Sequence, residues 1–322
     1  MGKIAGLLLV AIVALGGYFF WQKNGQKVNS GETAVFGSTS QEAKNFSLNN
    51  WFPKISGANF NKNVGQGPYL SAKSAILVNY DTGDVLYAKN AKDRLPAAST
   101  IKIMTTLLAL ENANLADKFR VSASAASVGE NSMGLIEGER LTVEELLYGM
   151  MLVSGNDAAV TVAEGIAGGE ENFVAMMNQK AKSIGLDDTL FVNATGLDED
   201  GRVQYSTAYD LATMARYTWK NYGEFRKIAS TDHITLEQNS SHKAFDLYND
   251  TNLLTTYPGV RGIKPGFTWE AGLCLITYAE NGGKRLLAVI LNSEDRRGEM
   301  VELLDYGFAK YGIHVEHPGL DL

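Results

Sequence analysis

Residues 99–112 have the sequence STIKIMTTLLALEN, in which apolar side chains recur at mixed three- and four-residue steps. This spacing predicts a helix that is buried over most of its circumference. Ser99 and Lys102 are three residues apart and therefore share one face of that helix. Because Pro96 stops any upstream helix, Ser99 is expected near the helix N-terminus, where its backbone N–H is free to stabilise an oxyanion.

Ser99 and Lys102 form a candidate pair of nucleophile and base. A serine hydroxyl needs a neighbour that takes its proton, and a desolvated lysine near a second cation can have its pKa lowered far enough to do so. The same Ser-x-x-Lys spacing is also typical of a helix cap followed by a solvated lysine. The motif alone leaves both interpretations open.

Two further polar motifs follow in the chain. Thr142 and Glu145 predict a capping box that starts a helix from residue 143 to about 153. This helix leads into Ser154-Gly155-Asn156, where Gly155 permits a tight reversal that presents both flanking side chains. Residues 260–266, VRGIKPG, predict a short strand with a lysine near its end. Each segment also fits an ordinary turn or loop, but the three motifs in this order indicate one nucleophilic serine site.

The three motifs resemble those of the serine-type D-alanyl-D-alanine carboxypeptidases, the low-molecular-mass penicillin-binding proteins. The family motifs are Ser-x-x-Lys, Ser-x-Asn and Lys-Thr-Gly. The similarity runs over roughly residues 72 to 311 and includes residues 75–89, 193–197, 206–212, 262–272 and 303–308. The resemblance implies an α/β (α+β) fold of the β-lactamase/transpeptidase type. In this fold an antiparallel sheet is flanked by helices, a helical lobe is inserted, and the site lies between the lobes.

The resemblance also implies catalytic roles for five residues. Lys102 would accept the proton of Ser99, which would attack the penultimate D-Ala carbonyl. Lys264 would disfavour protonated Lys102 and attract the terminal carboxylate of the substrate. Ser154 would pass a proton to the departing D-Ala, and Asn156 would hold the acyl peptide.

Substrate-binding residues are implied in the same way. The oxyanion would rest on the backbone N–H groups of Ser99 and Phe267, beside Gly266. Arg296 would help to bind the carboxylate, although a solvated arginine at a helix start fits its sequence as well.

Pro265 departs from the family pattern, which usually has threonine at this place. Proline supplies neither a hydroxyl nor an N–H and is restricted within sheets to edge strands, first positions or bulges. An edge strand is what the resemblance implies, so the fold is expected to tolerate Pro265. Thr268 is close enough in sequence to be a candidate for the missing hydroxyl.

The expected function is a serine D-Ala-D-Ala carboxypeptidase that shortens peptidoglycan stem peptides and is inhibited by β-lactams. Two alternatives stay open. Pro265 allows a non-catalytic peptidoglycan-binding or β-lactam-sensing protein. A β-lactamase would share the site, but the sequence has no Glu-x-x-Leu-Asn segment like that of class A enzymes, and residues 170–172 predict a helix start instead.

Residues 5–21 are almost wholly apolar or glycine, which predicts a membrane anchor or signal segment over residues 1–27. An uncleaved anchor is favoured because the aromatic cluster at 18–21 resembles an interfacial belt and no clear cleavage site follows. Residues 28–71 predict a flexible tether and residues 72–322 the penicillin-binding domain. The expected location is therefore the extracytoplasmic face of the bacterial membrane, with secretion after cleavage as the alternative.

The net charge of −7 and the absence of a basic stripe with interleaved aromatics give no support for nucleic-acid binding. Cys274 is the only cysteine, so an intrachain disulfide is excluded, and its apolar surroundings predict a buried strand residue. The four histidines show no metal-ligand pattern, and we expect neither a metal nor a cofactor.

Hydrophobic periodicity predicts the remaining elements. The expected hairpin turn is at residues 81–84. Helices are expected at 158–166, 173–184 and 208–219, and strands at 233–237, 260–264, 272–279 and 285–291. A last helix is expected from about Gly298.

Overall fold

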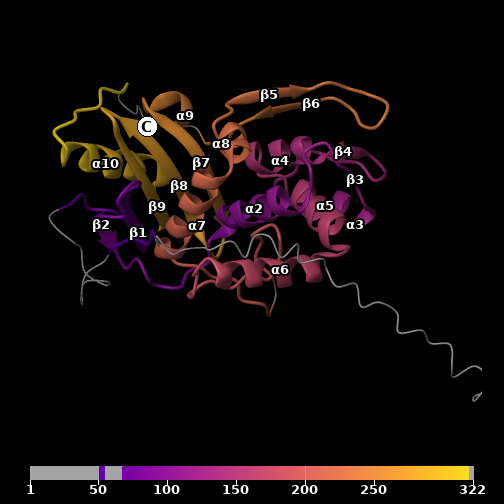
Figure 1. Cartoon of the computed structure of the whole chain (residues 1–322), viewed down its shortest axis with the longest axis horizontal. Coiled ribbons are helices and arrows are strands. Elements are labelled where there is room, and N and C mark those ends of the chain that lie inside the picture. The colour runs from indigo at the N-terminus through magenta and orange to yellow at the C-terminus, as the bar shows by residue number, and fades with distance from the viewer. Residues whose placement is uncertain (1–50, 55–66, 200, 252, 319–322) are drawn as a thin grey trace, which may run out of the picture. The chain divides into compact units, whose positions relative to one another are not determined.

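A computed structural model describes residues 51–54, 67–199, 201–251 and 253–318 of the chain (Figure 1). The predicted membrane segment lies outside these residues, as does most of the predicted tether. Two described segments within the predicted tether, residues 51–54 and 67–71, contact the folded domain. The Lys54 N–H donates to Gly83 O at 2.8 Å, and Leu70 is buried. Packing therefore begins before residue 72. No described helix is long and apolar enough to cross a membrane.

The centre of the fold is a five-stranded antiparallel sheet with the strand order β2-β1-β9-β8-β7. Its strands are β1 (Ser74–Asn79), β2 (Val85–Lys89), β7 (Val260–Thr268), β8 (Gly272–Asn281) and β9 (Lys284–Ser293). All residues of β1 are buried because its two faces belong to different apolar clusters. Ile76 and Val78 face one cluster, and Ala75 and Leu77 face the other.

Helices cover both faces of this sheet (Figure 1). Helix α10 (Arg296–Ala309) packs on β9 and β8 and supplies the smaller cluster, while α7 (Ala208–Asn221) packs against β9 and β1 within the larger one. The predicted helices and the predicted antiparallel architecture are confirmed.

The helical lobe is built around α2 (Lys102–Asn112), which contacts four neighbouring helices. These are α4 (Val143–Leu152), α5 (Asn156–Ala167), α6 (Glu170–Ser183) and α7. Packing on several sides explains why α2 is apolar around most of its circumference, as its sequence predicted. The capping box of Thr142 and Glu145 at the start of α4 is also confirmed.

Several short elements complete the described fold. They are α3 (Ala123–Ser127), α8 (Gly223–Ala229), α9 (Leu253–Thr256), a ribbon of β3 (Lys118–Arg120) and β4 (Arg140–Thr142), and a hairpin of β5 (His233–Leu236) and β6 (Phe245–Tyr248). Periodicity predicted only β5 among these strands. The strands β3 and β4 have three residues each, which is too short to show an alternating pattern. In β6 the alternation of buried and exposed residues covers only four residues.

Strand β7 runs beyond its predicted end and lies at the edge of the sheet. Its pairing with β8 continues through the proline, since Lys264 is opposite Ile276, Pro265 opposite Leu275 and Gly266 opposite Cys274. Pro265 is tolerated because an edge strand has one side without a ladder partner. The expectation drawn for this strand is confirmed.

Candidate active site

Ser99 lies in a short 3-10 turn, η1 (Ala98–Ile101), immediately before α2. The preceding residue, Ala98, has a left-handed backbone with φ of 47°. Two glycines let neighbouring backbone approach this turn closely. A β-carbon at Gly266 would lie 3.0 Å from the Ser99 nitrogen, and one at Gly196 would lie 2.2 Å from the Ala98 oxygen. The turn that carries Ser99 is therefore held between β7 and the loop around Gly196.

Lys102 lies beside Ser99 and is fully buried. Its Nζ is 2.8 Å from Ser99 Oγ, 2.8 Å from Asn156 Oδ1 and 2.6 Å from Thr195 O. A neutral amine has two N–H donors and one lone pair. Asn156 and Thr195 offer only acceptors to this amine, so they take both donors and leave the lone pair for the Ser99 O–H.

Burial is the main reason that the pKa of Lys102 lies well below its ordinary value, and the nearby charge of Lys264 lowers it further. A lower pKa favours the neutral amine, which is the form that can accept a proton. Geometry and electrostatics thus agree on Lys102 as the base for Ser99.

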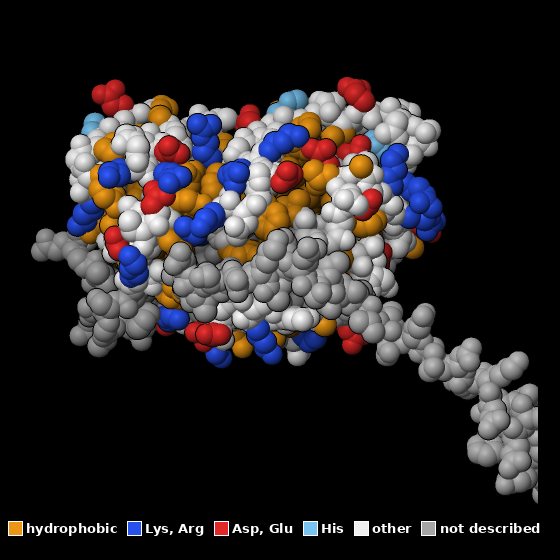
Figure 2. All heavy atoms as spheres, in the orientation of Figure 1, with side chains coloured by type: hydrophobic (Ala, Val, Ile, Leu, Met, Phe, Trp, Pro, Cys, Tyr) orange, Lys and Arg blue, Asp and Glu red, His pale blue; other side chains and the backbone are white. Residues whose placement is uncertain are grey.

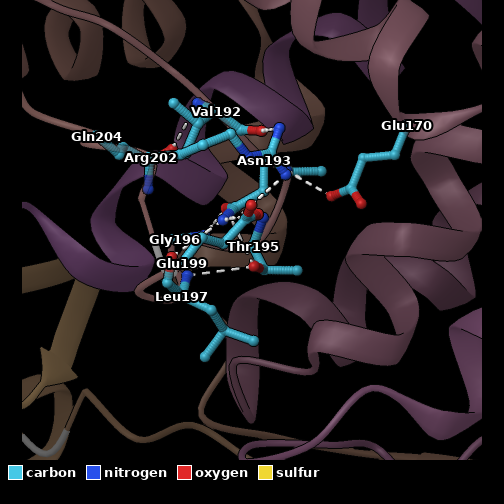
Figure 3. Close-up of polar contacts among 10 residues, drawn as sticks. Glu170, Val192, Asn193, Thr195, Gly196, Leu197, Glu199, Arg202 and Gln204 are labelled. Atoms are coloured by element: carbon cyan, nitrogen blue, oxygen red, sulfur yellow. Dashed lines mark hydrogen bonds and ion pairs between the residues drawn. The ribbon is translucent and has the colours of Figure 1, made fainter.

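The Thr195 carbonyl is positioned by a network of hydrogen bonds around Asn193 (Figure 3). Asn193 Oδ1 accepts from the N–H groups of Thr195 and Gly196, and its Nδ2 donates to Leu197 O and Glu199 Oε1. The same loop accepts a hydrogen bond at Ala194 O from the Thr105 hydroxyl on α2. The network therefore connects the loop to the helix that carries Lys102.

The second motif joins α4 to α5 and places Ser154 and Asn156 at the site. Ser154 has a left-handed backbone with φ of 61°, and it lines the cavity that contains Ser99. Asn156 contacts Lys102 through Oδ1 and donates through Nδ2 to Gly129 O at 3.0 Å. The tight turn predicted at Gly155 is therefore formed with the left-handed backbone conformation at Ser154.

Asp157 organises the loop that follows α3. Its carboxylate is buried and accepts hydrogen bonds from the backbone N–H groups of Met133, Gly134 and Leu135 and from the Ser132 hydroxyl. No role for Asp157 was predicted from its sequence. Its partners lie more than 20 residues upstream, where no local motif points to them.

Lys264 is fully buried on β7, and its Nζ has no hydrogen-bond partner among the described residues. The pKa of Lys264 is lowered to about 8, mainly by burial; the charge of Asp250 opposes this shift, and the charge of Arg296 adds to it. A buried ammonium without a partner is costly, and an anionic ligand would satisfy it.

A cavity of about 220 Å³ opens at Ser99. It is lined by Ser99, Glu130, Asn131, Ser154, Asp250, Pro265, Gly266, Phe267 and Arg296. Arg296 spans from α10 to this cavity, and its guanidinium donates to Gly266 O at 2.9 Å. Glu130, Asn131 and Asp250 were not predicted as site residues, because each lies in a loop outside the three motifs.

Thr268, which was expected to supply the missing hydroxyl, is not among the residues that line the cavity. Its hydroxyl donates to Asp198 Oδ1 at 2.9 Å and accepts from the Ala271 N–H at 3.1 Å. Thr268 therefore stabilises the turn after β7.

Cys274 is buried on β8, as its sequence predicted, and burial raises the pKa of its thiol to about 11. A protonated, buried thiol is a poor nucleophile. Within the part of the chain that the structure describes, no cluster of three or more His, Cys, Asp or Glu side chains could hold a metal ion.

Known proteins are similar to this chain in sequence and in fold. The sequence profile of the D-alanyl-D-alanine carboxypeptidase family matches residues 61–295. The D-alanyl-D-alanine carboxypeptidase DacF of Bacillus subtilis is 44% identical over 251 residues, which cover 76% of this chain and 64% of the relative. DacD of Escherichia coli is 35% identical over 269 residues, covering 79% of this chain and 68% of that protein.

Solved structures give the same result. The Streptomyces K15 DD-transpeptidase superposes with a TM-score of 0.71 at 31% identity and covers 76% of this chain and 100% of that one. The family profile, the relatives and the solved structure all point to one family. The chain belongs to the D-alanyl-D-alanine carboxypeptidase family.

Proposed function

We propose that this protein is a serine D-Ala-D-Ala carboxypeptidase that removes the terminal D-Ala from peptidoglycan stem peptides. The observation that carries the proposal is the Lys102 amine, which is buried, close to Ser99, and has acceptors for both of its N–H donors. The family relationship supports the choice of substrate.

The first step is acylation. Lys102 takes the Ser99 proton as Ser99 Oγ forms a bond to the penultimate D-Ala carbonyl carbon. The negative oxygen of the tetrahedral intermediate rests on the backbone N–H groups of Ser99 and Phe267. A single donor of this kind contributes about 3 kcal/mol to transition-state stability in other enzymes.

The terminal carboxylate of the substrate binds near Lys264 and Arg296. Lys264 has an unsatisfied Nζ, and Arg296 lines the cavity with only its Gly266 contact among the described residues. The positive charges of Lys264 and Arg296, which act on each other, favour a peptide that ends in a free carboxylate.

Release of the first product follows. The C–N bond breaks, Ser154 donates a proton to the departing D-Ala nitrogen, and Asn156 holds the acyl peptide. Water then attacks the ester at Ser99, giving the shortened peptide and the free serine. A β-lactam enters through the same acylation step, but its leaving group stays tethered, so deacylation is slow.

The deciding experiment measures D-alanine release from a peptide that ends in D-Ala-D-Ala, using the full chain and its Ser99→Ala variant. Release by the full chain and none by the variant would support the proposal. No release by a correctly folded full chain would overturn it.

Pro265 keeps a second candidate function in view, a peptidoglycan-binding or β-lactam-sensing protein. Pro265 lines the cavity at a place where the family usually presents a hydroxyl. The two functions separate in one assay, because a sensor would be labelled at Ser99 by penicillin without releasing D-alanine. Rapid penicillin hydrolysis would instead indicate a β-lactamase.

We further propose that the enzyme acts at the extracytoplasmic face of the membrane, held by residues 1–27. The proposal rests on the apolar sequence of residues 5–21 and on a cell-wall substrate. Membrane fractionation of cells that express the full chain or residues 28–322 would test it. Recovery of the full chain in the soluble fraction would contradict the anchor.

A further inference from the structure

A second cavity, of about 340 Å³, lies apart from the Ser99 site. It is lined by Tyr80, Asp81, Arg216, Trp219, Lys220, Arg226, Tyr278 and Arg285, none of which lines the Ser99 cavity. These residues come from the end of β1, the last turns of α7, α8 and the facing strands β8 and β9. The proposed carboxypeptidase reaction uses none of them.

The charge of this cavity is opposite to that of the whole chain. Three arginines and one lysine face a single aspartate, which leaves a formal charge of +3, while the chain carries −7. Figure 2 shows several Lys and Arg side chains close together over the region where α7 and α8 lie beside β8 and β9. The cavity is thus a local site of positive potential.

Two of the four cations already have local partners. The Arg285 guanidinium forms an ion pair with Asp81, with Nε at 3.0 Å from the carboxylate. Arg226 donates to the carbonyl oxygens of Trp219 and Lys220 in the last turn of α7, where the helix dipole is negative. Each of these contacts leaves other N–H groups of the same guanidinium for a ligand.

The other two cations are less compensated. Arg216 donates through Nε to Tyr80 O at 3.1 Å, and its guanidinium lies 4.7 Å from the Trp51 ring and 5.0 Å from the Tyr80 ring. These contacts orient the group without neutralising it. Lys220 is exposed, and its ammonium has no ion-pair partner among the described residues.

The guanidinium groups converge on one place. Arg216, Arg285 and Arg226 all act to lower the pKa of Tyr80, although burial outweighs them and raises it. Burial lowers the pKa of Arg216; Tyr80 and Asp81 oppose this shift, and the charge of Arg285 adds to it. Cations that repel one another around a hollow are stabilised when an anion enters it.

We propose that this cavity binds the phosphate group of a phosphate ester. Its donors belong to α7, α8 and β9 and therefore approach from different directions. A tetrahedral phosphate offers oxygens in several directions, whereas a planar carboxylate is satisfied by one guanidinium fork. The volume leaves room for a group of the size of glycerol beside the phosphate. Binding here leaves the Ser99 cavity free for substrate.

The test is calorimetric titration of the full chain with glycerol 3-phosphate at constant ionic strength. The variants are Lys220→Gln, which changes an exposed side chain, and Arg216→Lys, which keeps the charge but removes the planar fork. Lys182→Gln, at an exposed lysine on α6, is the matched control. We expect saturable binding that weakens about tenfold in both cavity variants and less than twofold in the control. D-Alanine release should be unchanged in all three.

Absence of saturable binding by the wild-type chain would overturn the proposal. Equal weakening in Lys182→Gln would do the same, because the attraction would then be general surface charge. Since the ester could be soluble or a lipid headgroup, the second arm compares flotation with phosphatidylglycerol and phosphatidylcholine vesicles. If the ester is a lipid headgroup, Lys220→Gln should reduce binding to phosphatidylglycerol vesicles and leave binding to phosphatidylcholine vesicles unchanged. Unchanged flotation, with weakened glycerol 3-phosphate binding, would assign a soluble ester.

Discussion

The Nζ of Lys102 lies 2.8 Å from the Oγ of Ser99, and its other two contacts, at Asn156 Oδ1 and Thr195 O, are both with acceptors. In the neutral amine, the two N–H donors go to Asn156 and Thr195, so the lone pair is left to accept the Ser99 O–H. The acid–base role of Lys102 is therefore open to a quantitative test.

Replacing Lys102 with methionine keeps most of the buried volume but removes the base. The rate of Ser99 acylation by a fluorescent penicillin should fall by about 10²–10⁴-fold, the usual contribution of a general base. Thermal unfolding of the same variant checks that the fold survives. Labelling within tenfold of the wild-type rate would show that another group takes the proton.

The activity should depend on pH through Lys264. Its pKa of about 8 means that the positive charge is present below this pH and is lost above it. The value of kcat/KM for a peptide with a free carboxylate should therefore fall as the pH rises through about 8. A peptide with an amidated C-terminus is the control, and its kcat/KM should not fall as the pH rises through about 8. Identical profiles for both peptides would exclude a carboxylate contact with Lys264.

Pro265→Thr should increase turnover, because it adds a hydroxyl at a position that lines the cavity. A hydrogen bond to a charged group contributes about 1.5–3 kcal/mol, so kcat/KM for D-Ala-D-Ala peptides should rise about tenfold or more. Thr268→Val is the matched control, since its hydroxyl bonds to Asp198 outside the cavity, and its KM should change less than twofold. An unchanged kcat/KM in Pro265→Thr, together with a raised KM in Thr268→Val, would instead identify Thr268 as the substrate contact.

Gly266→Ala should impair acylation, because the new β-carbon would lie 3.0 Å from the Ser99 nitrogen and displace the turn that carries the oxyanion donor. We expect acylation to fall by about 10²–10³-fold, comparable to the loss of an oxyanion donor. Gly169→Ala introduces a methyl group with no atom within 4 Å and should have no effect on this rate. Normal acylation by Gly266→Ala would show that the turn can move without loss.

Asp157→Ala should destabilise the protein, because it leaves the N–H groups of Met133, Gly134 and Leu135 without their buried acceptor. Each unsatisfied donor costs about 1–3 kcal/mol, so the free energy of unfolding should fall by about 3 kcal/mol or more. Urea denaturation measures it. Asp187→Ala, at an exposed carboxylate, should change it by about 0.5 kcal/mol or less.

Much of the fold could be predicted from short-range patterns. The turn at residues 81–84, the capping box of Thr142 and Glu145, and the helices of the lobe all depend on neighbouring residues, and all are confirmed. The strand β6 was missed because four residues carry too little periodicity, and Asp157 was missed because its partners are distant in sequence.

The sequence by itself determined that Ser99 and Lys102 share a helical turn, because a spacing of three residues places two side chains on one face. It also determined the family through three motifs in order. Only the tertiary structure decided the chemistry of the pair. Burial lowers the pKa of Lys102, and the acceptors that orient its amine lie 54 and 93 residues away in the chain. Desolvation and hydrogen-bond direction depend on which distant segments pack together, and no local pattern encodes them.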